Sequence, residues 1–163
     1  HGFEFGDQRL GLLLRQGDPL DLAKLYREWS DRLTLFTNGA PVDGMIRQAL
    51  GDLGVSIVDD TVIAFEHDNG DMRGVITAGG AVAIDALFTH PPARFSTNIG
   101  LELGCETKET PAGLRFATSE WKATSVPGVA AAGDIALAAP SISYAVADGV
   151  AAGASTHRSL FAG

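Results

Sequence analysis

A glycine and an acidic residue, Gly133-Asp134, stand between a short apolar run and an alanine-rich stretch. Glycine lets a ligand approach the backbone closely, and the Asp134 carboxylate can accept hydrogen bonds from sugar-like hydroxyl groups. A helix that opens at Pro140 and Ser141, with Ser141 as its N-cap, would point free amide groups at the same ligand, where they suit a carbonyl or anionic oxygen. These residue types indicate a site for a dinucleotide-type ligand.

Three elements must position these groups. Residues 129–132 are small and apolar, which predicts a short buried strand, and Pro127 and Gly128 predict a turn before it. The helix that follows carries small residues such as Ala145 and Ala152, so one of its faces should be nearly flat. The residues alone leave an alternative open, in which an ordinary strand, an Asx turn and a packing helix bind no ligand.

The stretch from Thr124 onwards resembles the last flavin-binding segment of the thioredoxin-reductase-like flavoproteins. Their pattern is Thr-Ser/Asn-hydrophobic-Pro-Gly-hydrophobic, then Ala-Ala-Gly-Asp and a helix of small residues. The matching positions are Thr124, Ser125, Pro127, Gly128, Ala131, Ala132, Gly133 and Asp134. In that family the aspartate binds the ribityl and pyrophosphate part of FAD, and amides at the start of the next helix meet the pyrimidine edge of the flavin.

The resemblance therefore implies FAD as the cofactor and a set of cofactor-binding residues. That set is Gly133, Asp134, Ile135, Ser143, Tyr144 and Ala145. Asp134 would take the first role, and the amides of the last three residues the second. Many relatives have Arg-Gln-Ala where this chain has Ser143-Tyr144-Ala145.

The first residues carry a second match. The stretch His1-Gly2-Phe3-Glu4-Phe5 resembles a subgroup of the same flavoproteins in which a Cys-Pro-x-Cys redox pair is followed directly by His-Gly-Tyr/Phe-Glu. The resemblance implies that His1 flanks such a pair and could move a proton near a thiolate, although a terminal histidine without any role is the simpler interpretation. No Gly-x-Gly-x-x-Gly motif occurs, so the adenosine half of a flavin site has no candidate.

Composition limits the class of protein. Twenty glycines among 163 residues, with only 7% aromatic residues, fit an α/β protein with close backbone packing. A net charge of −8 argues against nucleic-acid partners, because a polyanion would be repelled. The single cysteine, Cys105, excludes an internal disulfide framework and predicts a buried, inert thiol in a reducing cytoplasm. No apolar run reaches the roughly 20 residues of a membrane span.

The order of apolar runs predicts two lobes. Residues 9–14 and 33–37 predict parallel strands around a helix at 18–29, and a helix at 41–53 and a strand at 55–58 follow. The helix at 18–29 should pack through Leu22, Leu25, Tyr26 and Trp29. Runs at 62–66, 72–77 and 82–84 predict an antiparallel meander, and a strand at 86–89 should return the chain to the other lobe, where a helix is expected at 93–104.

The expected fold is thus a Rossmann-like βαβ nucleotide-binding lobe with an antiparallel β-meander, followed by the C-terminal part of an FAD-binding lobe. The boundary is placed near Asp85, which gives an NAD(P)-binding-like lobe at 1–85 and the FAD-lobe part at 86–163. Trp29 and Trp121 are expected to be packing anchors. His90, which follows the return strand, is interpreted as a structural histidine.

The first lobe departs from relatives that bind NADPH. Where they have a Gly-rich loop, this chain has Arg15-Gln16-Gly17-Asp18-Pro19, and Asp18 would repel a pyrophosphate. Where they have a basic cluster for the 2′-phosphate, it has Thr37-Asn38-Gly39. These departures make NADPH a doubtful cofactor and favour a flavin-dependent dithiol oxidase, or a reductase fed by another donor.

The functional hypothesis from the sequence is part of a thioredoxin-reductase-like, FAD-dependent pyridine nucleotide-disulfide oxidoreductase. The substrate would be a disulfide or dithiol, in a protein or a small molecule, and the parent protein a cytoplasmic homodimer. By itself the chain is expected to be inactive, with no catalytic residue and no metal site. Two alternatives stay open: a non-catalytic binding module that reuses the scaffold without flavin, and a remnant with no function of its own.

Overall fold

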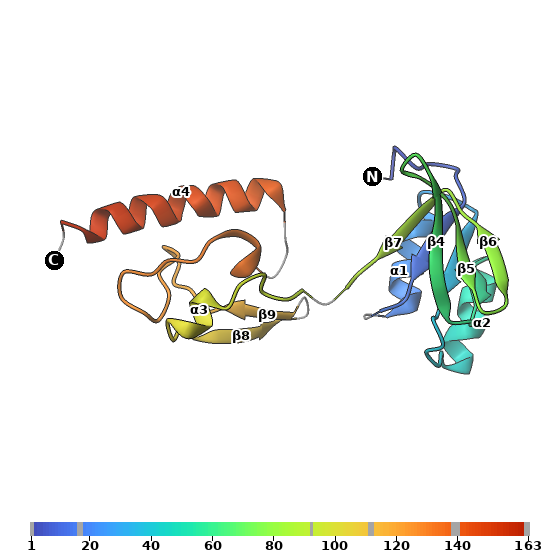
Figure 1. Cartoon of the computed structure of the whole chain (residues 1–163), viewed down its shortest axis with the longest axis horizontal. Coiled ribbons are helices and arrows are strands. Elements are labelled where there is room, and N and C mark those ends of the chain that lie inside the picture. The colour runs from blue at the N-terminus through green and yellow to red at the C-terminus, as the bar shows by residue number, and fades with distance from the viewer. Residues whose placement is uncertain (1, 16–17, 92, 111–112, 138–140, 162–163) are drawn as a thin grey trace. The chain divides into compact units, whose positions relative to one another are not determined.

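The computed structural model describes residues 2–15, 18–91, 93–110, 113–137 and 141–161. It divides the chain into two compact units, His1–Pro91 and Pro92–Gly163 (Figure 1). A parallel sheet and antiparallel strands combine with helices, which confirms the α/β class. Three parts of the predictions lie outside the described residues, namely His1, the loop residues Gln16 and Gly17, and Pro140. Among the described residues, no helix has the length and apolar character to cross a membrane.

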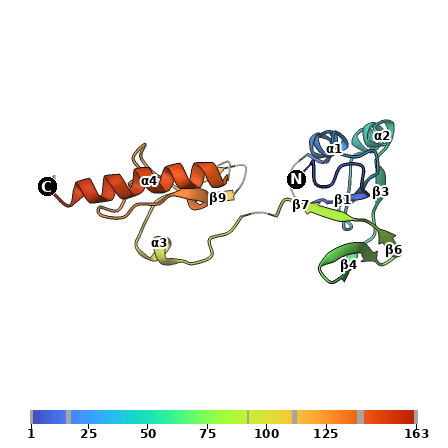
Figure 2. The same ribbon diagram turned by 90° about the horizontal axis from the view of Figure 1, so that it is seen from above.

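The first unit contains a parallel sheet of order β3-β2-β1-β7 and an antiparallel sheet of order β4-β5-β6. Helices α1 and α2 lie on one side of the parallel sheet and the antiparallel sheet on the other (Figure 2). The elements are β1 (Leu10–Leu13), α1 (Pro19–Arg27), β2 (Leu33–Phe36), α2 (Gly44–Asp52), β3 (Ser56–Val58), β4 (Val62–Asp68), β5 (Asp71–Thr77), β6 (Gly80–Ala83) and β7 (Ala86–Thr89).

Strand β1 is the centre of this unit. It pairs in parallel with β2 and with β7, and all of its residues are buried. Leu10 and Leu12 belong to a buried cluster with Tyr26 of α1, whereas Leu13 belongs to a second cluster with Val75 of β5. Since side chains alternate between the faces of a strand, the sheet has an apolar core on each face, which explains the continuous apolar run in the sequence.

Aspartates begin both helices of the first unit. Asp18 Oδ1 accepts a hydrogen bond from the Leu20 amide at 2.8 Å, and Asp43 Oδ1 accepts one from the Met45 amide at 2.8 Å. Helix α2 therefore starts after Asp43 and not at residue 41 as predicted. It ends at Asp52, and Gly54 follows the C-cap residue Leu53 with a φ of +73°, a left-handed conformation that glycine adopts readily.

Two sequence predictions for the first unit need correction. Leu25 is 49% exposed, and the buried side of α1 is formed instead by Ala23 and Tyr26. The strand at 86–89, expected to belong with the second lobe, is β7 of the first sheet, because its backbone pairs with β1. The division between the units consequently follows Pro91, a few residues beyond Asp85.

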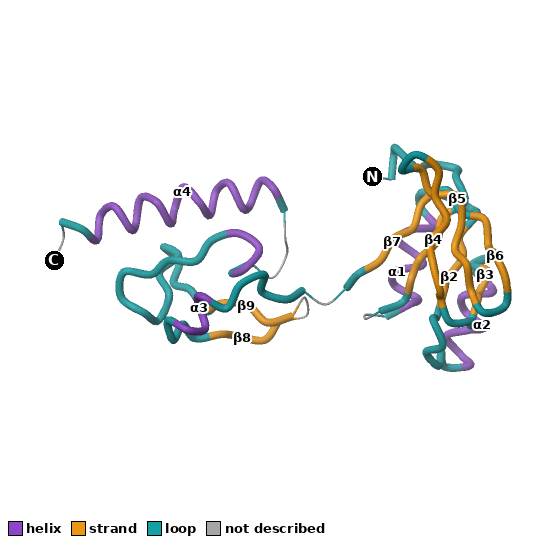
Figure 3. Tube along the Cα trace, viewed as in Figure 1, coloured by secondary structure: helices purple, strands orange, loops and turns teal. Residues whose placement is uncertain are grey.

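The second unit contains α3 (Ile99–Glu102), β8 (Thr107–Thr110), β9 (Gly113–Phe116), the one-turn 3-10 helix η1 (Gly133–Ile135) and α4 (Ile142–Ser159). Apart from η1, the described chain between β9 and α4 is almost entirely loop and turn (Figure 3). The core is small: Cys105, Phe116, Ala131 and Ala136 are buried, and the Phe95 ring stacks on the Phe116 ring at 4.3 Å.

Three predictions for the second unit need correction. The helix at 93–104 forms only as α3, whose N-cap residue is Asn98. The Thr97 hydroxyl just before it accepts a hydrogen bond from the Ile99 amide at 3.3 Å. The strand at 129–132 is reduced to an isolated bridge between Ala123 and Ala130. Trp121 is 61% exposed and is not a packing anchor. Trp29, by contrast, packs as predicted, with its ring 4.9 Å from that of Tyr26.

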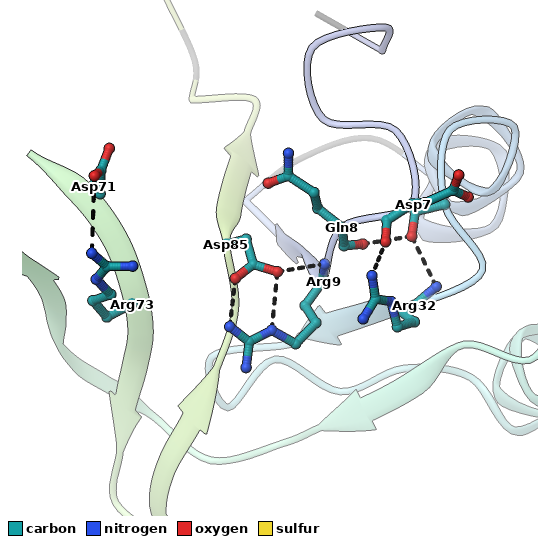
Figure 4. Close-up of polar contacts among 8 residues, drawn as sticks. Asp7, Gln8, Arg9, Arg32, Asp71, Arg73 and Asp85 are labelled. Carbon is teal, nitrogen blue, oxygen red and sulfur yellow. Dashed lines mark hydrogen bonds and ion pairs between the residues drawn. The ribbon is translucent and has the colours of Figure 1, made fainter.

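An ion pair fixes the entry to β7. The Asp85 carboxylate accepts hydrogen bonds from the Arg9 backbone amide at 2.8 Å and from Arg9 Nε at 3.0 Å, and it also pairs with Arg9 Nη2 (Figure 4). The hydrogen bond from the Arg9 side chain is the main reason that the pKa of Asp85 falls to about 2. A lowered pKa in the folded state stabilises the protein above the unfolded pKa, and this contribution is lost as the pH falls through the folded value.

The substitution Asp85→Asn should therefore lower the free energy of unfolding by about 1 kcal/mol at neutral pH. It should also remove part of the stability loss that the unsubstituted chain shows between about pH 4 and pH 2. Asp71→Asn is the control, because Asp71 is exposed and lies 3.9 Å from Arg73. Urea unfolding at several pH values measures both, and an Asp85→Asn midpoint equal to that of the parent at neutral pH would contradict this role.

Candidate functional site

One open groove in the second unit brings the Gly-Asp turn and the start of α4 together. Its lining consists of Ala132, Gly133, Asp134, Ser141, Ile142 and Ala145. Asp134 is exposed at the groove, whereas Gly133 beside it is buried. Ile135 belongs to the same turn of 3-10 helix and is 42% exposed. The Gly133-Asp134 turn and the helix that the sequence predicts after it therefore line the same groove.

Gly133 sets the shape of the turn. Its φ is +73°, a conformation that costs an L-residue about 1–2 kcal/mol. Its carbonyl oxygen accepts hydrogen bonds from the amides of Ala136 and Leu137, both at 2.9 Å, which close the turn. A Cβ atom added to Gly133 would lie 3.4 Å from the Cβ of Ala145, so the turn and α4 approach closely because both residues are small.

The first turn of α4 leaves backbone donors for a ligand. Ser141 is the N-cap residue, as predicted, but its hydroxyl makes no capping hydrogen bond. Its carbonyl accepts the Ala145 amide at 2.9 Å, which is the first bond of the helix. The amides of residues 142–144 precede any intrahelical partner. Ser143 and Tyr144 are exposed, and the predicted contact through their amides stays a prediction.

An ion pair that is largely shielded from solvent contacts the backbone of the Gly133 turn. Lys122 Nζ is 2.8 Å from Asp148 Oδ1, and Asp148 Oδ2 accepts a hydrogen bond from the Gly133 amide at 3.3 Å. Asp148 is only 8% exposed. The hydrogen bond from Lys122 is the main reason that the pKa of Asp148 is lowered, and the bond from Gly133 acts in the same direction. Asp148 is therefore a carboxylate held charged inside the unit.

Sequence reasoning did not find this pair. Lys122 and Asp148 lie far apart along the chain, and no local spacing links them. One signal was present, because Asp148 interrupts the small and apolar stretch 145–154, three residues after Ala145 and on the same face of the helix. An acidic residue there must be paired if it is buried.

The edge of the first unit where the sequence predicts a nucleotide is occupied by the unit's own side chains. Asp18 caps α1, where a pyrophosphate would otherwise meet the amides. After β2, Asn38 Oδ1 accepts the Val62 amide at 2.8 Å. Asp59, after β3, receives two hydrogen bonds from Arg47 at 2.8 and 3.0 Å, and these are the main cause of its lowered pKa.

Several other polar side chains of the first unit contact one another or the backbone. The Tyr26 hydroxyl lies 2.8 Å from His90 Nε2, which is consistent with a structural role for His90. Before β1, Arg32 donates a hydrogen bond to the Asp7 carbonyl, and within β5 Arg73 pairs with Asp71 (Figure 4). Within the described ranges, no three His, Cys, Asp or Glu side chains gather in a way that could hold a metal ion.

The chain thus combines a parallel sheet and an antiparallel sheet in its first unit with a second unit in which the Gly-Asp turn and the start of α4 line one groove. The first comparison is an oxidoreductase from Agrobacterium tumefaciens, with 31% identity and a TM-score of 0.81 over 98% of this chain and 53% of that one. HlmI shares 31% identity, with a TM-score of 0.81 over 98% of this chain and 50% of that one.

A protein from Bacillus anthracis described as the thioredoxin reductase TrxB shares the fold, with 23% identity and a TM-score of 0.86 over 98% of this chain and 53% of that one. No protein-family model matches the sequence, and no curated protein matches it either. The structure of the chain is thus similar to those of thioredoxin-reductase-like oxidoreductases, which confirms the resemblance stated from the sequence. It spans about half the length of the solved proteins it matches.

A substitution at Gly133 tests whether the turn beside the groove requires a residue without a side chain. Gly133→Ala should lower the free energy of unfolding by about 1–2 kcal/mol, because a Cβ is disfavoured at this φ and would crowd Ala145. Gly149→Ala is the matched control, since it lies in α4 with open space around it and should stabilise the helix by roughly 0.5–1 kcal/mol. Chemical denaturation of both variants measures the difference, and similar effects of the two would refute the argument.

Proposed function

We propose that the protein carrying this chain is an FAD-dependent oxidoreductase that acts on a disulfide or dithiol, and that the groove at Gly133 and Asp134 is part of its flavin site. The observation that supports this most is the exposed Asp134 carboxylate in one groove with the start of α4. FAD would supply two-electron redox chemistry between a substrate sulfur pair and a second electron carrier.

The residues present fit this cofactor. The Asp134 carboxylate is an acceptor for the hydroxyl groups of a ribityl chain. The buried Gly133 has no side chain to obstruct a ligand that approaches the turn. The amides at the start of α4 can donate to flavin carbonyl oxygens, and the positive end of the helix dipole favours electron density there. Ile135, Ser143, Tyr144 and Ala145 are the neighbouring residues we assign to the same site.

The first unit points to an electron partner other than NADPH. A bound dinucleotide would place its pyrophosphate beside the Asp18 carboxylate, which already accepts the Leu20 amide. It would place a 2′-phosphate near Asn38 and Asp59, where Arg47 is already paired with Asp59. We therefore propose a flavin-dependent dithiol oxidase, or a reductase fed by another donor.

Homodimerisation in the cytoplasm completes the proposal. Helix α4 exposes large apolar residues that a folded protein would normally cover, including Ile142 at 86%, Val146 at 64% and Val150 at 69%. Such a surface favours association with further polypeptide. Cys105 is a free thiol, and a reducing compartment would keep it so.

Removal of the Asp134 carboxylate should weaken flavin binding. In the full-length protein, Asp134→Ala should lower FAD affinity by roughly tenfold or more, because hydrogen bonds to a charged acceptor are lost. Glu120→Gln is the control, since Glu120 is an exposed acid of the same unit outside the groove. Flavin absorbance after gel filtration measures retention. A colourless parent protein would favour the alternative of a binding module without flavin.

NADPH should leave the thermal midpoint of the protein unchanged. A ligand that binds the folded state at 100 times its Kd would add about 2.7 kcal/mol of stability, so binding would be easy to detect. A thermal scan with increasing NADPH, with NADH alongside, measures this. A clear rise of the midpoint with either nucleotide would show that the first unit binds a dinucleotide after all.

A further inference from the structure

Helix α4 meets the Gly-Asp turn along one face. Ala145, Asp148 and Ala152 are separated by three and four residues, so they lie on the same side of the helix. Ala145 packs close to Gly133. One turn further along, the Asp148 carboxylate accepts a hydrogen bond from the Gly133 amide. The helix therefore holds the turn at two successive levels, once through close packing and once through a hydrogen bond.

Lys122 connects the same region to the preceding loop. Its backbone adopts a φ of +66°, which is uncommon for a residue other than glycine. Its carbonyl accepts the Ala131 amide at 3.0 Å, two residues before Gly133, while its ammonium group reaches Asp148 at 2.8 Å. One residue thus binds both the segment that leads into the turn and the helix that follows it.

The two acids of this region, Asp148 and Asp134, differ in burial and in pairing. Asp148 is nearly buried and paired with Lys122, whereas Asp134 is exposed and has no ion pair among the residues described. Because Lys122 neutralises the buried acid, the acid at the groove stays available as an acceptor. A buried carboxylate without a cation would be costly, so Asp148 depends on Lys122.

We infer that Lys122 and Asp148 are positioning residues, which hold the Gly133–Asp134 turn against the start of α4 in the geometry that receives the flavin. This inference rests on the proposed function. Neither side chain lines the groove, so both act through the backbone of Gly133 and through the placement of α4. The pair acts as a clamp whose two ends, Lys122 and Asp148, lie on different segments.

The test compares substitutions of the clamp in the full-length protein. Asp148→Asn and Lys122→Met should each weaken FAD retention by roughly tenfold, because each removes a charged partner. Lys122→Arg keeps the cation and should restore most of the retention. Asp59→Asn is the matched control, since it breaks a similar ion pair with Arg47 in the first unit. Visible circular dichroism of the bound flavin reports its environment, which a change of stability alone would leave unaltered.

A second measurement needs no cofactor. Amide hydrogen exchange of the chain should become faster at residues 131–137 and 142–148 in Asp148→Asn, while β1 and β2 keep their protection. Unchanged exchange there, or flavin retention and dichroism equal to those of the parent protein, would overturn the clamp. If the parent protein holds no flavin but exchange rises as expected, the proposed function fails and the clamp remains as a feature of the turn.

Discussion

The close approach of α4 to a left-handed glycine is the constraint on which the second unit depends. The backbone at Gly133 can turn as it does because no side chain is present, and the helix can come near because Ala145 is small. Close packing buries the Gly133 amide, which must then find an acceptor. Asp148 supplies it, and Lys122 supplies the charge that makes a buried carboxylate tolerable. Steric and electrostatic requirements are thus met by a few residues.

The sequence predicted the first unit well because its elements carry strong periodic signals. The apolar runs that became β1 and β2 are buried on both faces, and Asp18 with Pro19 marks the start of α1. In the second unit the prediction of a strand at 129–132 was wrong, because a strand needs a hydrogen-bonded partner that a local pattern does not reveal. The groove followed from the order of Gly133, Asp134 and α4, but the Lys122–Asp148 pair did not, since tertiary folding alone brings it together.

The two units use acidic residues in different ways. In the first unit Asp18, Asp43, Asp59 and Asp85 cap helices or pair with arginines, so the carboxylates stabilise the scaffold. In the second unit one acid is used for structure and another is left exposed in a groove. Asp134 differs in this way from the structural acids, which is the reason it attracts a functional interpretation.

The solitary thiol has a consequence for electron capacity. Interconversion of a dithiol and a disulfide moves two electrons and requires two sulfur atoms. These 163 residues contain one cysteine, Cys105, which is 7% exposed and lies 3.5 Å from the Thr124 hydroxyl. The segment can therefore store no reducing equivalents as an intramolecular S–S bond. In the proposed flavoprotein, the electrons held near this segment would reside on the isoalloxazine ring of the flavin. The two sulfur atoms of the redox couple would come from other residues or from the substrate.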